Sequence, residues 1–112
     1  MLKRLNNVEM SARVIRDGLV AVVYSPGFGA GWYTWNREST EILFDPNIVT
    51  YVETKQWNEL KVYMGLKYPD LYLGGIGDLT LEWIPVGSQF KVTEYDGSES
   101  IEYRDSEDWL TA

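Results

Sequence analysis

Apolar and polar positions form two hairpin patterns, and the first lies at residues 11–24. Two β-favouring runs there flank Asp17-Gly18, a dipeptide that suits a two-residue type I′ turn. This turn places Ile15 opposite Val20 and, further from the turn, Val14 opposite Ala21 and Ala12 opposite Val23. Because the second run is apolar at every position from 19 to 23, we expect a central strand that is covered on both faces.

The second hairpin is predicted around Asp96-Gly97, from the runs 90–95 and 100–104. Its register pairs Phe90 with Tyr103, Val92 with Ile101, and Lys91 with Glu102. The apolar pairs share one face and the opposite charges meet on the other, so turn and alternation agree. Residues 79–85 also alternate and predict a further strand before this hairpin.

Helical spacing is confined to the centre of the chain. Asp45-Pro46 is typical of a helix start, since Asp caps free N–H groups and Pro is tolerated in the first turn. Apolar residues then recur at helical spacing at 48–52 and again at 57–68, where Pro69 ends the pattern. The sequence predicts two short helices or one kinked helix.

Strands near both ends with helices between them predict an α+β fold. We expect a mainly antiparallel β-sheet, built from the N-terminal and C-terminal hairpins, with one or two short central helices packed on it. The length of 112 residues fits one domain, 1–112. Residues 1–10 are interpreted as an N-terminal segment prone to fraying, and 105–112 as an acidic C-terminal tail whose Trp109 and Leu110 dock on the body.

Composition removes several kinds of chemistry. The chain has no Cys and no His, which excludes disulfides, thiolate zinc sites, His-ligated metals and the usual nucleophilic triads. We therefore predict no catalytic residues, no metal site and no cofactor. Any enzyme would depend on carboxylates, Lys, Tyr, Ser or Thr.

The net charge of −7 bears on partners. An acidic chain is repelled by nucleic-acid phosphates and by anionic membranes, so we expect neither direct nucleic-acid binding nor membrane binding. The first ten residues lack the apolar run of a secretory signal, and the chain has no stretch of about 20 apolar residues that could span a bilayer. These observations favour a cytoplasmic protein.

Residues 25–36, SPGFGAGWYTWN, combine a glycine-rich loop with aromatic rings. A phosphate-binding loop is disfavoured, because a strand-like run follows the glycines where a helix is needed. If 32–36 is a strand, successive rings face opposite sides, and one side places rings away from the core. The candidate binding residues are Phe28, Gly29, Trp32, Tyr33 and Trp35; a sharp turn followed by core packing is the alternative interpretation.

Acidic side chains mark a second candidate surface at Glu94, Glu99 and Glu102. The predicted register sets Glu94 opposite Glu99, which also raises the hypothesis of a carboxylate acid/base pair. Near a hairpin turn we expect these groups to be hydrated.

Four strings complete the picture: GFGAGWYTWN, EILFDP, YLGG and EYDGSESIEY. On these strings the chain resembles small uncharacterised proteins encoded by bacteriophages and prophages, over most of residues 10–112. The resemblance implies expression in the bacterial host cytoplasm and an accessory role during infection, and it assigns no residue a role.

Three functions remain open from the sequence. The first is a non-catalytic module that binds a protein, such as a host protein whose activity it modulates. The second is a nucleotide or carbohydrate binder that uses the glycine loop and the aromatic cluster. The third is a carboxylate-dependent hydrolase. Homo-oligomerisation is compatible with each of them.

Overall fold

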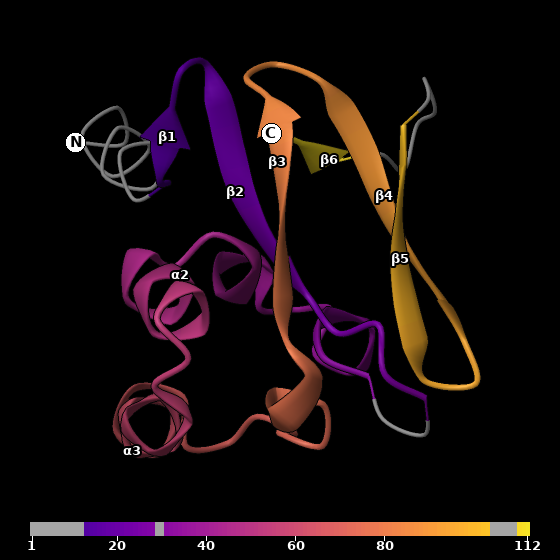
Figure 1. Cartoon of the computed structure of the whole chain (residues 1–112). Helices are drawn as coiled ribbons and strands as arrows, with labels where there is room; N and C mark the ends of the chain where they lie inside the picture. Colours follow the sequence, from indigo (N-terminus) through magenta and orange to yellow (C-terminus); the bar gives the residue numbers. More distant parts are fainter. Residues whose placement is uncertain (1–12, 29–30, 104–109) are drawn as a thin grey trace, which may run out of the picture.

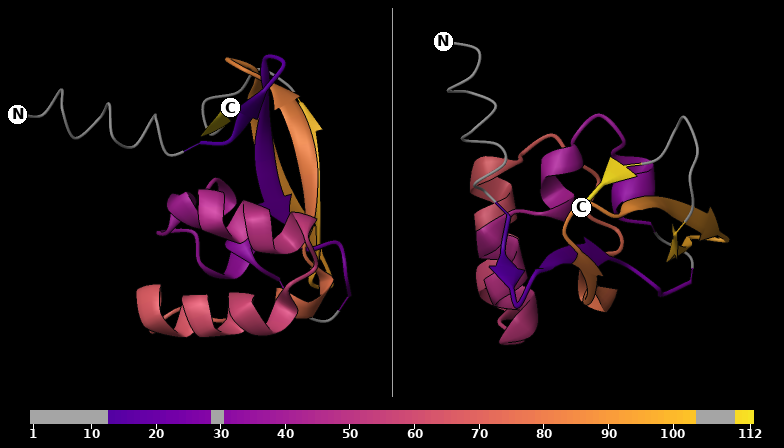
Figure 2. Two further views of the ribbon diagram at one scale, coloured as in Figure 1. Left: turned by 60° about the vertical axis from the view of Figure 1, so that its left-hand side comes forward. Right: turned by 90° about the horizontal axis from the view of Figure 1, so that it is seen from above.

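The computed structural model describes residues 13–28, 31–103 and 110–112. It shows the predicted α+β fold, in which two three-stranded antiparallel sheets form one layer and helices pack beside them (Figures 1 and 2). The first sheet has the order β1-β2-β3 and the second has the order β5-β4-β6. The predicted antiparallel β-sheet is thus divided into two sheets.

The strands of the first sheet are β1 (Ile15–Arg16), β2 (Leu19–Tyr24) and β3 (Thr80–Pro85). Those of the second are β4 (Gln89–Tyr95), β5 (Ser98–Tyr103) and β6 (Leu110–Thr111). Between β2 and β3 lie η1 (Tyr33–Trp35), η2 (Thr40–Leu43), α2 (Pro46–Glu53), α3 (Trp57–Lys67) and η3 (Ile76–Asp78).

Both predicted hairpins are confirmed with their registers. Asp17 and Gly18 have φ angles of 52° and 77°, and Asp96 and Gly97 have φ angles of 51° and 84°. Two consecutive positive φ angles are the requirement of a type I′ turn. The pairs Ile15–Val20, Phe90–Tyr103, Lys91–Glu102 and Val92–Ile101 all form as predicted, and Ala12 lies outside the described residues.

The central strand β2 anchors the core. Its residues from Val20 to Val23 are all buried, because β1 and β3 flank it within the sheet and α2 packs on β2 and β3. From the second sheet, Phe90 and Val92 join the same apolar cluster. A strand that is apolar on both sides is therefore buried on both sides, as the sequence predicts.

The chain end also packs as part of the second sheet. Leu110 pairs with Phe90 in β6, and the buried Ala112 exchanges backbone hydrogen bonds with Gly87 and Ser88. This confirms that Leu110 docks on the body, whereas Trp109 lies outside the described residues.

Residues 32–36 are not the predicted strand, because residues 33–35 form the 3-10 turn η1. The backbone N–H groups of Trp32 and Thr34 both donate to one carboxylate oxygen of Glu99, at 2.9 and 2.7 Å. In an extended strand those two nitrogens would stand about 6.6 Å apart, too far for one oxygen to accept from both. A distant side chain thus overrides the local β preference of the aromatic run.

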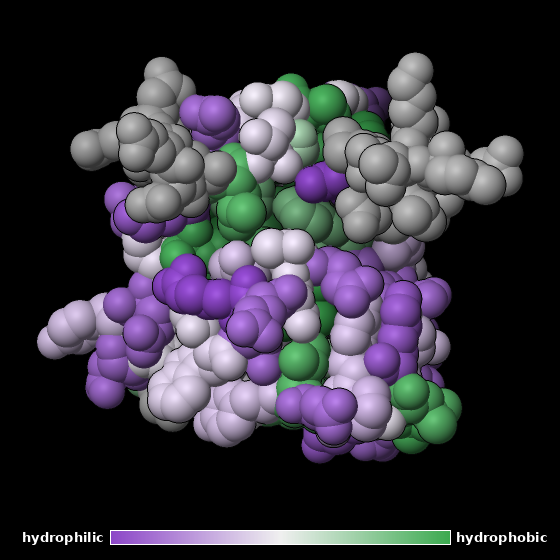
Figure 3. All heavy atoms as spheres, turned by 180° about the vertical axis from the view of Figure 1, so that it is seen from behind, coloured by the Kyte–Doolittle hydropathy of each residue, from purple (hydrophilic) through white to green (hydrophobic). Residues whose placement is uncertain are grey.

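The two short helices are confirmed. Asp45 caps α2 by accepting from the N–H groups of Asn47 and Ile48, at 2.8 and 3.4 Å. α3 turns Leu60 and Met64 inward but leaves Leu66 80% exposed. In the surface view, apolar atoms gather at the lower right, over α3 (Figure 3). Within the described residues, no helix is long and apolar enough to cross a membrane.

Candidate functional site

The candidate site is built on two glycine-containing segments that are distant in sequence and adjacent in space. A side chain at Gly75 would come within 2.6 Å of the Gly31 carbonyl oxygen and 2.7 Å of the Ser25 hydroxyl oxygen. Such distances are far below van der Waals contact, so the backbone at position 75 must lack a Cβ atom. The loop after β2 therefore lies directly against the bend that precedes η3.

The carboxylate of Glu99 holds the first of these segments in place. Oε1 accepts from the Ser25 N–H at 2.9 Å, while Oε2 accepts from the Trp32 N–H and from both the N–H and the hydroxyl of Thr34. The Glu99 side chain is buried, at 1% exposure, and it makes no ion pair with any described residue. Four donors thus compensate a buried carboxylate, which makes the loop geometry specific.

The tip of the β4–β5 hairpin is fastened to the same loop. The Glu99 N–H donates to the Ser25 carbonyl at 2.8 Å, and the Ser98 hydroxyl donates to the Pro26 carbonyl at 2.6 Å. Side chain and backbone of β5 therefore both fix the segment that begins at Ser25.

These contacts correct the prediction that Glu99 belongs to a hydrated acidic surface. Glu94 does pair with Glu99 across the hairpin, but Glu94 is exposed and accepts from the Gly97 N–H at 2.8 Å. Glu102 is exposed as predicted. Because the Glu99 oxygens are buried and occupied, the Glu94–Glu99 pair has no free carboxylate on the Glu99 side to present to a substrate.

An exposed aromatic pair, Trp35 and Tyr72, stands on the two segments. The two rings stack with their centroids 5.1 Å apart and an interplanar angle of 27°, while 54% of Trp35 and 44% of Tyr72 remain exposed. Stacking and close contact with the backbone restrict both rings, since a Cβ atom at Gly31 or Gly74 would collide with them.

Asn36 ties the two halves of the aromatic pair together. Its amide nitrogen donates to the Tyr72 carbonyl at 2.8 Å, and its amide oxygen accepts from the Tyr72 N–H at 3.0 Å. The same nitrogen donates to the Trp32 carbonyl at 2.9 Å. One side chain therefore links the backbones that carry both rings.

The predicted aromatic cluster divides into two groups. Trp35 and Phe28 are exposed, Phe28 by 71%, and they stay candidates for binding. Trp32 is fully buried and Tyr33 is 6% exposed, so the prediction that they form part of a binding surface is wrong, and both belong to the core. Gly29 lies outside the described residues.

Sequence reasoning missed Tyr72, and it placed Glu99 on the wrong, hydrated surface. Tyr72 lies two residues before the glycine-rich bend Gly74-Gly75, a signal like that of Trp35 after its own glycine loop. Glu99 shares the strand face of Ile101, the apolar face of the predicted hairpin, which could have marked it as an inward-facing carboxylate.

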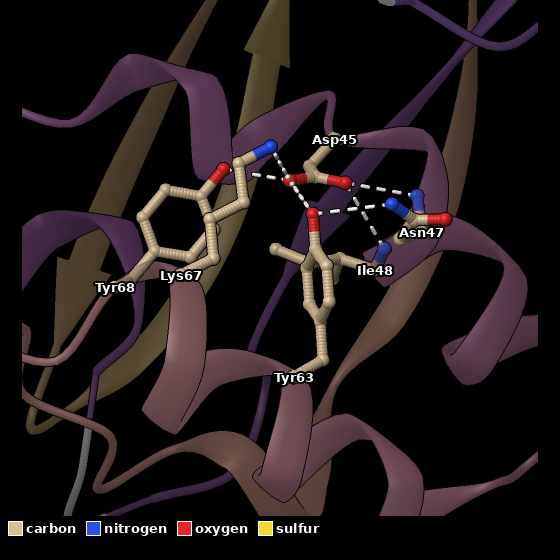
Figure 4. Close-up of polar contacts among 6 residues, drawn as sticks. All are labelled: Asp45, Asn47, Ile48, Tyr63, Lys67 and Tyr68. Atoms are coloured by element: carbon tan, nitrogen blue, oxygen red, sulfur yellow. Dashed lines mark hydrogen bonds and ion pairs between the residues drawn. The ribbon is translucent and has the colours of Figure 1, made fainter.

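A second polar cluster surrounds the buried Asp45, where α2 begins (Figure 4). Its Oδ2 accepts from the Tyr68 hydroxyl at 2.6 Å, from the Tyr63 hydroxyl at 2.7 Å and from the Lys67 ammonium at 3.1 Å. Burial opposes ionisation of Asp45, but the hydrogen bonds from Tyr68, Tyr63 and Lys67 prevail and hold its pKa below the ordinary value.

The Asp45 cluster is suited to stability and not to proton transfer. Burial, followed by the hydrogen bond to Asp45, raises the pKa of Tyr68 far above its ordinary value, and burial likewise raises the pKa of Tyr63. Both phenols therefore stay protonated near neutral pH and donate to Asp45, while the Tyr63 hydroxyl also accepts from the Asn47 amide at 3.2 Å. The cluster joins the start of α2 to the end of α3.

Among the described residues, no group of three or more acidic side chains is placed to hold a metal ion.

Comparison with known proteins finds no matching family model, no similar curated protein and no similar solved structure.

Proposed function

We propose that this protein is a non-catalytic interaction module that binds a protein partner through the aromatic pair, with Phe28 on the adjoining loop as a further contact. The observation that carries the proposal is the stacked and exposed pair of Trp35 and Tyr72. Trp and Tyr are the side chains that most often supply the binding energy of protein interfaces.

The hydrogen bonds that hold the aromatic pair in place favour a role in binding over exposure without a function. Asn36 links the two backbones, and Glu99 fixes the loop that leads to Trp35. Rings that are already ordered lose less conformational freedom when a partner covers them. Burying the Glu99 carboxylate costs free energy. A binding surface whose loop geometry is fixed in advance gives a physical reason for that cost.

The resemblance to phage and prophage proteins suggests which partner to seek. An accessory protein made in the bacterial cytoplasm during infection would meet host proteins, and modulation of one of them is the role we propose. The net charge of −7 favours a partner with a basic rim around an apolar centre.

The test compares the wild type with Trp35→Ala and Tyr72→Ala as baits in nuclease-treated bacterial lysate. Val86→Ala is the matched control, since Val86 is 53% exposed on the β3–β4 turn, away from both glycine-containing segments. We expect one stoichiometric partner with the wild type and the control, and its loss with both aromatic variants. If folded aromatic variants retain the partner, the surface is wrongly assigned.

A small ligand is the second candidate, because the outer faces of the aromatic pair are open to a sugar or a nucleobase. A thermal-shift screen separates the two proposals. A ligand at about 100 times its Kd should add about 2.7 kcal/mol to the free energy of unfolding, and Trp35→Ala should abolish that gain. If no sugar or nucleotide in a broad library shifts the unfolding temperature, the protein partner is left as the only proposal.

A further inference from the structure

The dipeptide Asp-Gly occurs twice in the chain, at 17–18 and at 96–97, and each copy forms the turn of a hairpin. The two turns have nearly the same backbone conformation, since φ is 52° at Asp17 and 51° at Asp96 and both glycines also have positive φ angles. They lie at opposite ends of the β-layer (Figure 1). A difference in reactivity between the two copies in the folded protein therefore has to come from their surroundings.

Asp-Gly is the dipeptide in which an aspartyl side chain reacts most readily with its own backbone, because glycine has no Cβ atom beside the attacking nitrogen. The glycine nitrogen bonds to the carboxyl carbon of Asp, and the carboxyl hydroxyl leaves with the amide proton as water. A second water molecule then opens the succinimide ring. Cleavage between the nitrogen and the original backbone carbonyl carbon gives isoaspartate, in which the chain runs through the side-chain carbon.

The amide nitrogen of Gly18 is open to this reaction. Asp17 and Gly18 are exposed, and no described residue accepts from the Gly18 N–H or donates to the Asp17 carboxylate. Gly18 is bonded through its carbonyl oxygen, which accepts from the Val86 N–H at 2.9 Å and takes no part in ring closure. β1 spans two exposed residues at a sheet edge, so the hairpin can open locally and let the carboxyl group meet the nitrogen.

The corresponding nitrogen of Gly97 is held in place. Gly97 is buried, and its N–H donates to the Glu94 carboxylate at 2.8 Å. β4 and β5 form six residue pairs, and the Ser98 hydroxyl beside the turn donates to the Pro26 carbonyl at 2.6 Å. The Gly97 nitrogen must therefore give up its hydrogen bond, in a hairpin tip that is itself fastened, before it can attack Asp96.

We propose that Asp17 is a modification site, at which isoaspartate forms spontaneously in the folded protein, while the hydrogen bond from Gly97 to Glu94 protects Asp96. Isoaspartate adds one carbon to the backbone of the β1–β2 turn, which no longer fits a two-residue type I′ turn. β2 stays in place, because six of its residues pair with β3. The modified chain therefore remains folded, with a loosened β1, and accumulates with time in solution.

Incubation of the folded protein near neutral pH tests the proposal. Isoaspartate is quantified in each turn by digestion, methylation of isoaspartyl carboxylates with an isoaspartyl methyltransferase and S-adenosylmethionine, and mass spectrometry of the peptides. We expect Asp17 to convert several-fold faster than Asp96. In protein unfolded by guanidinium chloride the two rates should be similar, because both dipeptides are then solvated. Equal rates in the folded protein, no isoaspartate at Asp17, or the same preference in the unfolded protein overturns the proposal.

Two substitutions of Glu94 test the protecting hydrogen bond. Glu94→Ala frees the Gly97 N–H and should raise conversion at Asp96 several-fold, while conversion at Asp17 in the same sample stays unchanged. Glu94→Gln is the matched control, because its amide oxygen still accepts from Gly97. Circular dichroism checks that both variants are folded. Unchanged conversion at Asp96 in Glu94→Ala contradicts protection by this hydrogen bond.

Discussion

Glu99 and Thr34 meet through two hydrogen bonds, both 2.7 Å long, from the N–H and the hydroxyl of Thr34 to one carboxylate oxygen. The two residues are 65 positions apart in the chain. This contact joins the second hairpin to the loop that carries Trp35, so the geometry of the candidate site depends on a strand from the other sheet.

Glu99→Gln tests that dependence. An amide nitrogen cannot accept from the N–H groups that now point at the carboxylate, so at least one buried donor loses its partner. We expect the free energy of unfolding to fall by about 1–3 kcal/mol in urea denaturation. Glu94→Gln, on the paired strand, keeps an acceptor for Gly97 and should change it by less than about 0.5 kcal/mol. Equal stability of the two variants would show that Glu99 does not organise the loop.

Two glycine substitutions should change the stability of the protein in opposite directions. Gly75→Ala would force a Cβ atom against the Gly31 carbonyl and should lower stability, because backbone has to move. Gly65→Ala lies within α3 with no atom within 4 Å of the added Cβ, and should raise stability by about 0.5–1 kcal/mol. Thermal unfolding of the two variants measures both, and a stable Gly75→Ala protein would contradict the close packing of the two segments.

Asp45 predicts a loss of stability in acid. Its pKa is lowered in the folded protein, so its contribution is present above the unfolded pKa of about 3.9 and is lost as pH falls through the folded pKa. Asp45→Asn can still cap α2 but carries no charge to lose. Urea denaturation from neutral pH downwards should show the wild-type advantage over Asp45→Asn shrinking below about pH 4. A constant difference would contradict the lowered pKa.

The raised pKa of Tyr103 predicts a loss of stability at alkaline pH. Burial, and then its hydrogen bond to Glu82, raises the pKa of Tyr103 to about 12. The neutral phenol therefore stabilises the fold below the unfolded pKa of about 10, and this contribution is lost as pH rises towards the folded value. NMR titration of the tyrosine rings should find this group, and Glu82→Gln should bring its pKa closer to 10. An unchanged titration in the variant would assign the shift to burial alone.

Local rules predicted most of the fold. Asp17-Gly18 and Asp96-Gly97 demand positive φ angles, and the turns they form fix the register of both hairpins. Asp45-Pro46 likewise marks the start of α2 by capping chemistry that involves only its neighbours. In these cases every determinant lies within a few residues of the element.

The geometry of the candidate site could not be predicted, because the residues that determine it are distant from one another in the sequence. The aromatic run after the glycine loop has β-favouring residues, but the carboxylate of Glu99 gathers its N–H groups into a turn. The stacking of Trp35 on Tyr72 likewise depends on two loops meeting. Pairing of side chains 37 or 65 residues apart leaves no periodic signal in the sequence.

The hydrogen bonds of Glu99 also determine when, during synthesis, the loop that carries Trp35 can take its shape. They close sequence separations of 74, 67 and 65 residues, to Ser25, Trp32 and Thr34. During synthesis such closures must wait until β5 has been made. The loop that carries Trp35 therefore takes its shape only once β5 is present, so a partner that recognises it would discriminate chains that contain β5 from nascent or truncated chains that lack it.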